Sequence, residues 1–396
     1  MREDWEYKTF GEIGTFLRGK NIQKTDFVSG GLPCIHYGQI HTKFDISIDY
    51  HLSEIPQEVY DKAIIASPGD VIIAITSEDI DGSCKSVVWL GNYDIAVSAH
   101  AAILKHNMNG KFIAYYLRSN TFFTQKLKYA RGFKVMEIKT KDLAKLVLPI
   151  PPKPTQLSIV SELDKLNELI QIKKEQLKDY DALAQSIFYE MFGNPVENEK
   201  GWEVKKLGEL CSKIGSGATP RGGNESYKDE GISLIRSLNV YNNEFRRKDL
   251  AYIDDEQAAA LSNVTILEDD VLLNITGASV ARCCIVPSDL LPARINQHVC
   301  IIRPFDNVLV PIFLNKVLTN ISYQIRLLTL ARSKGATREA LPKSVVDSLL
   351  VPLPPLSLQQ SFAHKIGQIE RQKAEVQKTI TDLETLLAAR MQYWFD

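Results

Sequence analysis

The sequence predicts an α+β fold with two β-rich domains in tandem repeat, separated by two long antiparallel coiled-coil helices. Three observations predict it: a set of motifs occurs twice in the same order, a long heptad pattern follows each set, and short strand-like runs lie between the motifs. The 396 residues are enough for two or three domains. An apolar content of 44% and a charged content of 24% are ordinary for a globular protein.

Three pairs of motifs indicate that the chain is a tandem duplication. WEYKTFGEI at residues 5–13 returns as WEVKKLGEL at 202–210, DVIIAIT at 70–76 returns as DVLLNIT at 270–276, and LPIPP at 148–152 returns as VPLPP at 351–355. Order and spacing are kept, which is the signature of a repeat architecture. Two equivalent copies related by a two-fold axis would make the molecule pseudo-two-fold symmetric with its termini close together. Trp394 and Phe395 should then lie near Trp5.

Each copy has the same internal plan. Short β-branched and aromatic runs come first, separated by turn signals such as PGD at residues 68–70. A short helical stretch follows, at residues 112–128 and 311–328, and then a proline-rich hinge leads into a long helix. Ser357 with Gln360 predicts a capping box at the start of the second long helix.

The two long helices carry heptad stripes. Apolar residues recur in alternating steps of four and three over residues 159–191 and again over residues 362–390. Such a stripe is the pattern of a coiled coil, which needs at least two helices. Because the sequence contains no third stripe of this kind, the two helices are expected to pair with each other. Lys173 and Lys373 each interrupt a stripe. These lysines either fix the register or are tolerated because their long side chains reach solvent.

Two similar but unlike domains on a rigid spacer suit the reading of two unlike half-sites on DNA, because the spacing of a DNA-binding protein mirrors that of its site. The copies differ most in glycine-containing loops, where polar side chains can donate to phosphates and base edges. The candidate DNA-binding residues in these loops are Arg18, Lys20, Asn21, His36 and Tyr37 in the first copy, and Thr219, Arg221, Arg236 and Asn239 in the second. Any one such loop is more often plain surface, and recurrence at matched positions favours function.

Basic segments also recur, between the short helix and the proline hinge. They add the candidates Arg131 and Lys134 in the first copy, and Arg332, Lys334 and Arg338 in the second. An isolated basic run is usually a solvated surface, but two at one structural position predict phosphate contacts on each domain. The net charge of −1 neither favours nor excludes a nucleic acid. His100 and His298 recur as well, and are predicted to be core or hydrogen-bonding residues.

Together these motifs resemble Type I restriction-modification specificity subunits. The resemblance rests on the doubled WE opening, the PGDVI strand at residues 68–72, the LPIPP hinge and the segment GATPRGGNESY at residues 217–227, and it covers essentially the whole chain. It implies two target-recognition domains, at residues 1–154 and 193–356, each reading one half of a bipartite site in double-stranded DNA. It also implies two spacer helices, at residues 155–192 and 357–396, which set the distance between the half-sites and dock modification subunits.

The resemblance further implies that the chain is a non-catalytic, cytoplasmic subunit. Its expected partners are DNA, two modification subunits that bind S-adenosylmethionine and methylate adenine, and restriction subunits that hydrolyse ATP and cut DNA. S-adenosylmethionine, ATP and Mg are thus expected on the partner subunits. No cofactor, metal site or catalytic residue is expected in this chain, and no membrane association.

Two alternatives remain open. A self-contained DNA methyltransferase or endonuclease would need an Asn/Asp-Pro-Pro-aromatic motif or a phosphate-binding glycine loop, and the sequence has neither. A non-DNA coiled-coil scaffold could use the proline segments at residues 151–154 as a polyproline ligand, but their duplication before each long helix fits a hinge better. The six cysteines lack metal-site spacing and are predicted to be reduced thiols.

Overall fold

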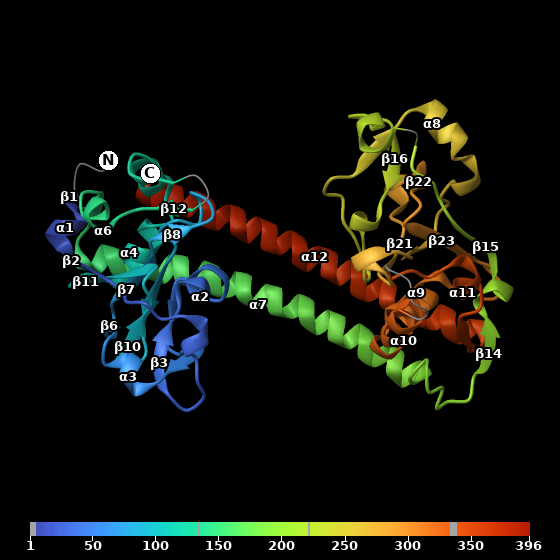
Figure 1. The fold of residues 1–396 in the computed structure, drawn as a ribbon, viewed down its shortest axis with the longest axis horizontal. Helices are drawn as coiled ribbons and strands as arrows, with labels where there is room; N and C mark the ends of the chain where they lie inside the picture. Colours follow the sequence, from blue (N-terminus) through green and yellow to red (C-terminus); the bar gives the residue numbers. More distant parts are fainter. Residues whose placement is uncertain (1–4, 133–134, 221, 333–338) are drawn as a thin grey trace. The chain divides into compact units, whose positions relative to one another are not determined.

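The computed structural model describes residues 5–132, 135–220, 222–332 and 339–396 (Figure 1). By its contacts the chain divides into two compact units. Unit 1 comprises Met1–Glu175 and Gln377–Asp396, and unit 2 comprises Gln176–Val376. Both units mix helices with sheets, as the α+β prediction requires. The predicted sites Lys134, Arg221, Lys334 and Arg338 lie outside the described residues.

Unit 1 contains two larger sheets. The first has the order β2 (Gly14–Arg18), β11 (Ala101–His106), β7 (Val71–Ala74), β9 (Ser86–Trp89) and β4 (Ser47–Ile48). The second has the order β5 (Ser53–Ile55), β3 (Leu32–Ile35), β10 (Ile95–Val97) and β6 (Ile64–Ala66). Every residue of β7 and β9 is buried, which explains why these strands read as continuous apolar runs rather than alternating ones. The described residues of the unit also form two strand pairs, β1 (Glu6–Thr9) with β13 (Val147–Ile150) and β8 (Thr76–Ser77) with β12 (Met136–Glu137).

Unit 2 repeats much of this pairing. One sheet has the order β15 (Cys211–Ser216), β23 (Val299–Pro304), β20 (Val271–Asn274) and β21 (Cys283–Ile285), and another has the order β19 (Ala251–Ile253), β16 (Ile232–Ile235) and β22 (Ala293–Ile295). Smaller pairs are β14 (Glu203–Lys206) with β24 (Leu350–Leu353) and β17 (Val240–Tyr241) with β18 (Glu244–Phe245). The parallel pair β16–β22 corresponds to the parallel pair β3–β10 of unit 1. The duplication seen in the motifs therefore extends to the strand pairing.

The short helical stretch predicted in each copy is two helices. Unit 1 has α4 (Gly110–Tyr116) and α5 (Asn120–Leu127), and unit 2 has α9 (Pro311–Thr319) and α10 (Ile321–Arg332). A side-chain cap explains each break, because Ser119 Oγ accepts from the Phe122 amide at 3.2 Å and Asn320 Oδ1 accepts from the Ser322 amide at 3.0 Å. The remaining helices are short: α1 (Phe10–Ile13), α2 (Tyr37–Thr42), α3 (Gln57–Tyr60), α6 (Thr140–Leu143), α8 (Asp255–Ala260) and α11 (Lys343–Asp347).

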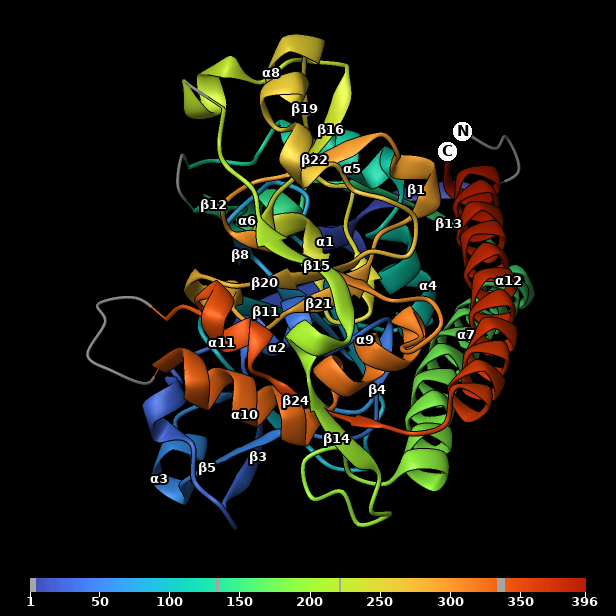
Figure 2. The ribbon, with the colours of Figure 1, turned by 90° about the vertical axis from the view of Figure 1, so that its right-hand side faces the viewer.

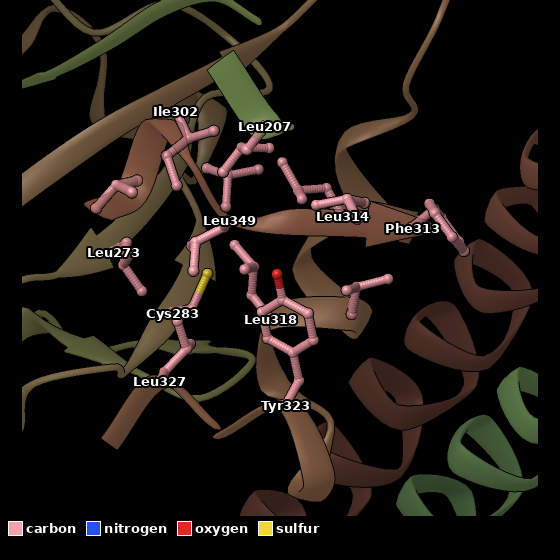
Figure 3. Packing of buried hydrophobic residues seen from close by; sticks show 14 of the residues in the cluster. Leu207, Leu273, Cys283, Ile302, Phe313, Leu314, Leu318, Tyr323, Leu327 and Leu349 are labelled. Atoms are coloured by element: carbon pink, nitrogen blue, oxygen red, sulfur yellow. The ribbon is translucent and has the colours of Figure 1, made fainter. Parts of the chain in front are cut away.

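The main core of unit 2 lies between the β20 sheet and the helices after it. Leu314 and Leu318 of α9 and Tyr323 and Leu327 of α10 face buried residues of the sheet such as Leu273 (Figure 3). In Figure 2, α8 and β16 lie at one end of unit 2 and α10 and α11 lie toward the other, with β20 and β21 between them. Unit 1 has a corresponding cluster in which α4 and α5 pack on β7 and β11.

The two predicted long helices are present as α7 (Lys153–Phe192) and α12 (Leu356–Phe395), with 40 residues each. Their predicted stripe positions are buried or half-buried, including Ile159 and Phe362 at 0% exposure. In unit 1 the helices run antiparallel, since Glu162 bonds Arg390 and Lys174 bonds Glu384. The capping-box prediction is wrong: α12 begins at Leu356, so Ser357 already lies inside its first turn.

Trp5 and Phe395, which are close to the two ends of the sequence, lie in the same part of unit 1, as predicted. Trp5 and Phe395 belong to one hydrophobic cluster, and the Phe395 ring lies 5.5 Å from Phe112 and 5.7 Å from Tyr116. All six cysteines are buried and free, in agreement with the prediction of reduced thiols. None of the helices in the described part of the chain has the length and apolarity needed to cross a membrane.

Candidate nucleic-acid interface

In unit 1, residues from distant parts of the sequence meet beside β8. Arg18 ends β2, and its Nε donates to the carbonyl of Ala99 at 3.2 Å. The Nη2 of Arg18 lies 3.2 Å from a carboxylate oxygen of Glu137, whose strand β12 pairs with β8 (Figure 1). Glu137 in turn exchanges two backbone hydrogen bonds with Arg131, at 3.1 and 2.8 Å. The structure thus brings the candidates Arg18 and Arg131 to one edge of the unit, and both are exposed.

The exit of β2 requires glycine. An ideal Cβ on Gly19 would lie 2.2 Å from the carbonyl oxygen of Ser98, closer than any side chain can approach. The glycine therefore lets the chain pass against residues 97–101, where the amides of Gly19 and Lys20 donate to the carbonyls of Ala101 and Val97. Lys20 and Asn21 follow this contact and are exposed. Their position fits the predicted role as groups that reach a ligand.

Tyr37 stands among three histidines. Its amide donates to Ser98 Oγ at 2.9 Å, and its ring lies 4.6 Å from His36, 4.8 Å from His100 and 6.2 Å from His41. His41 Nε2 lies 3.0 Å from the carbonyl of Thr76, so this nitrogen carries a proton when the bond forms. His100 is exposed and Tyr37 is half-buried. The cluster thus places aromatic and imidazole groups beside the Arg18 edge.

His36 is buried, unlike the other unit 1 candidates that the structure describes. Its Nδ1 accepts from the Gly38 amide at 3.2 Å, and its own amide donates to Gln39 Oε1 at 2.9 Å, so the residue caps the start of α2. Burial, with smaller effects from Lys24 and His100, lowers the pKa of the imidazole. The neutral ring therefore stabilises the start of α2 and packs against the ring of Tyr37.

Unit 2 builds the corresponding surface from different side chains. An ideal Cβ on Gly217 would lie 1.8 Å from the Ile295 carbonyl, so this glycine matches Gly19. Two residues later, Thr219 Oγ1 donates to Gln297 Oε1, and Gln297 Nε2 lies 3.2 Å from His298 Nε2. His298 Nδ1 is 2.5 Å from Thr276 Oγ1, which closes a polar chain of four residues. Gln297 is exposed at the centre of this chain.

Arg236 and Asn239 follow Ile235, whose carbonyl accepts from the amide of Asn296 at 3.0 Å, and of these two side chains only Asn239 is fully buried. The Arg236 guanidinium lies 5.3 Å from the Tyr227 ring centroid and donates to the Asp249 carbonyl. Asn239 is 0% exposed and uses its amide internally: it accepts from the Arg236 amide at 3.1 Å and donates to the carbonyls of Arg246 and Lys248. Asn239 therefore holds the loop that positions Arg236.

The second basic segment returns to the same edge of unit 2. Arg332 is exposed at the end of α10, with its Nε 2.7 Å from Glu339 Oε1. The Glu339 carbonyl accepts from the Gly277 amide at 3.0 Å, directly after Thr276. Unit 1 has the same arrangement, because Arg131 forms a β-bridge with Glu137 and Glu137 pairs with Thr76. Arg131 and Arg332, which begin the two basic segments, thus occupy corresponding places, as the sequence predicts.

Sequence reasoning missed part of this surface. The predicted hydrogen bonding of His298 is confirmed, whereas His100 is exposed against Tyr37 and is no core residue. Their recurrence just before β11 and β23 was the available signal. No such recurrence marked Gln297, because the first copy has Ala99 at the corresponding position. Within the described residues no group of three or more His, Cys, Asp or Glu side chains is placed to hold a metal ion.

Comparison with known proteins identifies the family. The family model for the Type I restriction modification DNA specificity domain matches residues 2–179 and 199–385. The chain belongs to this family. It is 24% identical to the protein assigned as the MjaX specificity subunit of a type I restriction enzyme in Methanocaldococcus jannaschii, over 97% of this chain and 93% of that protein. It is 22% identical to the type I restriction enzyme EcoBI specificity subunit of Escherichia coli, over 96% and 82% of the two chains.

Solved structures show the same fold. A chain from a structure concerned with complex assembly and conformational transition of the type I R-M system superposes with a TM-score of 0.61 and 18% identity, covering 99% of this chain and 97% of the other. The crystal structure of a Type-I restriction-modification S subunit from M. genitalium gives a TM-score of 0.57 and 13% identity, covering 99% and 96%. The chain is thus a Type I restriction-modification specificity subunit built from two DNA specificity domains.

Proposed function

We propose that each unit of this specificity subunit reads one half of a bipartite site in double-stranded DNA. The chain carries no catalytic centre in this proposal and acts in the cytoplasm as part of a complex. Two modification subunits dock on α7 and α12, and restriction subunits complete the complex. These partners bring S-adenosylmethionine, ATP and Mg and carry out methylation and cleavage. The names of the similar proteins, all specificity subunits, support this assignment of roles.

One observation carries the proposal: matched backbone positions hold unlike side chains at the candidate interface. The amides of Ile75 and Ile275 donate to the carbonyls of His100 and His298, both at 3.0 Å. The amides of Ser98 and Asn296 donate to the carbonyls of residues 35 and 235 at 3.1 and 3.0 Å. On this common backbone, His36 and Tyr37 of unit 1 correspond to Arg236 and Ser237 of unit 2. A shared scaffold with unlike polar groups is what two readers of unlike half-sites require.

The exposed cations supply the sequence-independent part of binding. Arg18, Lys20 and Arg131 in unit 1 and Arg332 in unit 2 are exposed and suited to phosphate contact. Arg18 and Arg332 are each held by a carboxylate, Glu137 and Glu339, which fixes their direction. Lys134, Lys334 and Arg338 belong to the basic segments of Arg131 and Arg332, and Arg221 belongs to the loop of Thr219; all four lie outside the described residues and are proposed for the same role.

The long helices set the distance between the half-sites. We place the target-recognition domains at residues 1–154 and 193–356, with spacer helices at 155–192 and 357–396 paired as an antiparallel, pseudo-symmetric coiled coil. Interhelical bonds support this pairing in both units, since Lys373 Nζ lies 2.7 Å from Asp181 Oδ1 in unit 2. This ion pair favours the interpretation that Lys373 fixes the register of the two helices over the alternative that the stripe only tolerates it.

Selection of bound DNA from a randomised duplex library tests the proposal. The full-length chain, alone and co-purified with its modification subunits, should enrich two short motifs separated by a fixed, unspecified spacer. The alanine variant of Arg131 should weaken all sequences alike and reduce the log–log salt slope by roughly 0.9. Enrichment of no motif, or of a single continuous one, would contradict the proposal.

A further inference from the structure

The unit 2 surface carries a continuous polar chain, Thr219–Gln297–His298–Thr276. An exposed glutamine normally samples several rotamers, and fixing such a side chain is entropically costly. Here both ends of the amide are held, Oε1 by the Thr219 hydroxyl and Nε2 by His298 at 3.2 Å. His298 is fixed in its turn by Thr276 Oγ1 at 2.5 Å. No packing requirement explains this arrangement, because Gln297 itself is exposed.

These two hydrogen bonds leave one N–H and one oxygen lone pair of the Gln297 side-chain amide unused within the described residues. A side-chain amide has two N–H hydrogens and two oxygen lone pairs. Among the hydrogen bonds of the described residues, Gln297 uses one of each, toward His298 and Thr219. Turning the amide over exchanges the two neighbours but leaves the same free pair, because threonine and neutral histidine can each donate or accept. The free pair therefore does not depend on how the amide is oriented.

We propose that Gln297 is a specificity-determining residue that reads adenine in the half-site of unit 2. Adenine presents N7 as an acceptor and its N6 amino group as a donor in the major groove, and glutamine pairs with both at once. Gln297 Nε2 donates to N7 while Oε1 accepts from N6. Thr219, His298 and Thr276 are positioning residues that hold the amide in place. This inference rests on the proposed function, since it names the base that one part of that interface recognises.

The corresponding position of unit 1 explains why the reading is confined to one half-site. Asn21, Thr76 and His100 occupy the places of Thr219, Thr276 and His298, but Ala99 replaces Gln297. The Ala99 carbonyl accepts from Arg18 instead. Unit 1 thus has the surrounding polar groups but no side-chain amide at the place of Gln297.

Library selection with Gln297 variants tests the inference, using the full chain in its complex with modification subunits. Gln297→Ala should reduce adenine preference by roughly 10-fold to 100-fold at one position of one half-site, the range expected for loss of a bidentate pair. Gln297→Glu should shift preference at that position to cytosine, because a carboxylate accepts from the N4 amino group. Every other position of both half-sites should keep its preference.

Two further variants separate positioning from simple surface polarity. Thr219→Val should weaken adenine preference at the same position, and Thr219→Ser, which restores the hydroxyl, should recover it. Gln57→Ala is the matched control, because Gln57 is an exposed glutamine of unit 1 that bonds only Asp61 within the described residues. It should change neither half-site.

The outcomes are distinguishable. A Gln297→Ala chain that folds and selects the wild-type motif unchanged overturns the inference and leaves the proposed function standing. A uniform loss of affinity at all positions also overturns it, because that result marks a backbone contact. If the wild-type chain itself selects no motif, the proposed function fails and the inference fails with it.

Discussion

At the scale of single residues, Asp270 and Arg303 form a bidentate ion pair inside unit 2. Both guanidinium–carboxylate distances are 2.7 Å, and the Asp270 side chain is fully buried. Asp270 also accepts from the Leu267 amide at 2.8 Å. In unit 1 the equivalent pair is Asp70 with Lys105, at 2.5 Å. The repeated aspartate of the DVIIAIT and DVLLNIT motifs is therefore a structural anchor of each sheet.

Replacing Asp270 by alanine should destabilise unit 2 by about 3 kcal/mol, because it leaves a half-buried guanidinium without its carboxylate. Asp70→Ala should cost less, since a flexible lysine reaches solvent more easily than a fixed guanidinium fork. Urea unfolding of each variant measures both values. Glu203→Ala is the control, because Glu203 belongs to an exposed surface pair with Lys205 and should have no measurable effect. Equal losses for Asp270→Ala and Glu203→Ala would contradict the anchor role.

His106 predicts a pH dependence for unit 1. Burial lowers the pKa of this imidazole from its ordinary value near 6.5, an effect that Asp70 opposes. The folded state then binds fewer protons than the unfolded state, so stability should fall as the pH drops through about 6.5 and level off below the folded pKa. Denaturation at pH 7.0 and 5.5 should show this loss. His106→Asn, whose oxygen can replace Nδ1 as acceptor for the Met108 amide, should show a smaller one. An undiminished loss in this variant would assign the effect to other groups.

Single residues are also where sequence reasoning reached its limit. Loop position could be predicted for Lys20 and Asn21, because the glycine and the repeat both mark that loop, whereas Arg18 is the last residue of β2. Burial could not be predicted, because Asn239 and His36 are polar residues that are nevertheless buried. Asn239 supports a loop and His36 supports the start of a helix. Gln297 was invisible because its role depends on a hydrogen bond to Thr219, 78 residues away in the sequence.

At the scale of elements, the proline hinge shows how a sequence landmark gains a physical role. Gln359, at 0% exposure, donates to the carbonyls of Pro354 and Val308 and accepts from the Val310 amide at 2.9 Å. Gln156 bonds Pro151 in the same way in unit 1. Each glutamine thus ties its hinge to the turn before α9 or α4. The repeat predicted the position of the hinge, and the heptads predicted α7 and α12. The exact start of α12 could not be predicted, because it depends on backbone hydrogen bonds to the Pro355 carbonyl that no sequence pattern indicates.

The proposed ruler role of α7 and α12 predicts a change in spacer length. Each helix has 40 residues, and removing residues 170–176 and 373–379 together keeps the heptad stripes in phase. The target-recognition domains should approach by about 10 Å, or roughly three base pairs. The second half-site would also rotate by about 100° around the duplex, so binding should weaken.

A library with randomised spacer lengths provides the readout. The surviving sites should have a spacer shorter by about three base pairs and unchanged half-site sequences. Deleting four residues from one helix alone should break the packing of the stripes and reduce stability. A folded double-deletion chain that still selects the original spacer would exclude the ruler.

At the scale of the whole molecule, the duplication makes each unit a separate body with its own core. Unit 1 combines the first copy with the end of α12, and Phe395 packs against Phe112 and Tyr116 there. Unit 2 contains the second copy with the end of α7, where Phe188 and Phe192 pack against Phe362. Each unit thus packs against parts of both helices and has a core of its own, as expected for separate domains.

Exchange of one target-recognition domain tests the central claim most directly. Residues 1–150 are replaced by the corresponding domain of a related specificity subunit, and the hybrid is used in the same library selection with its modification subunits. Because unit 2 keeps its core and its Thr219–Gln297–His298–Thr276 chain, one half-site should change to that of the donor and the other should stay as it was. The spacer should also be kept, since the helices beyond the hinge are unchanged. A folded, active hybrid in which both half-sites change together would contradict the two-reader account.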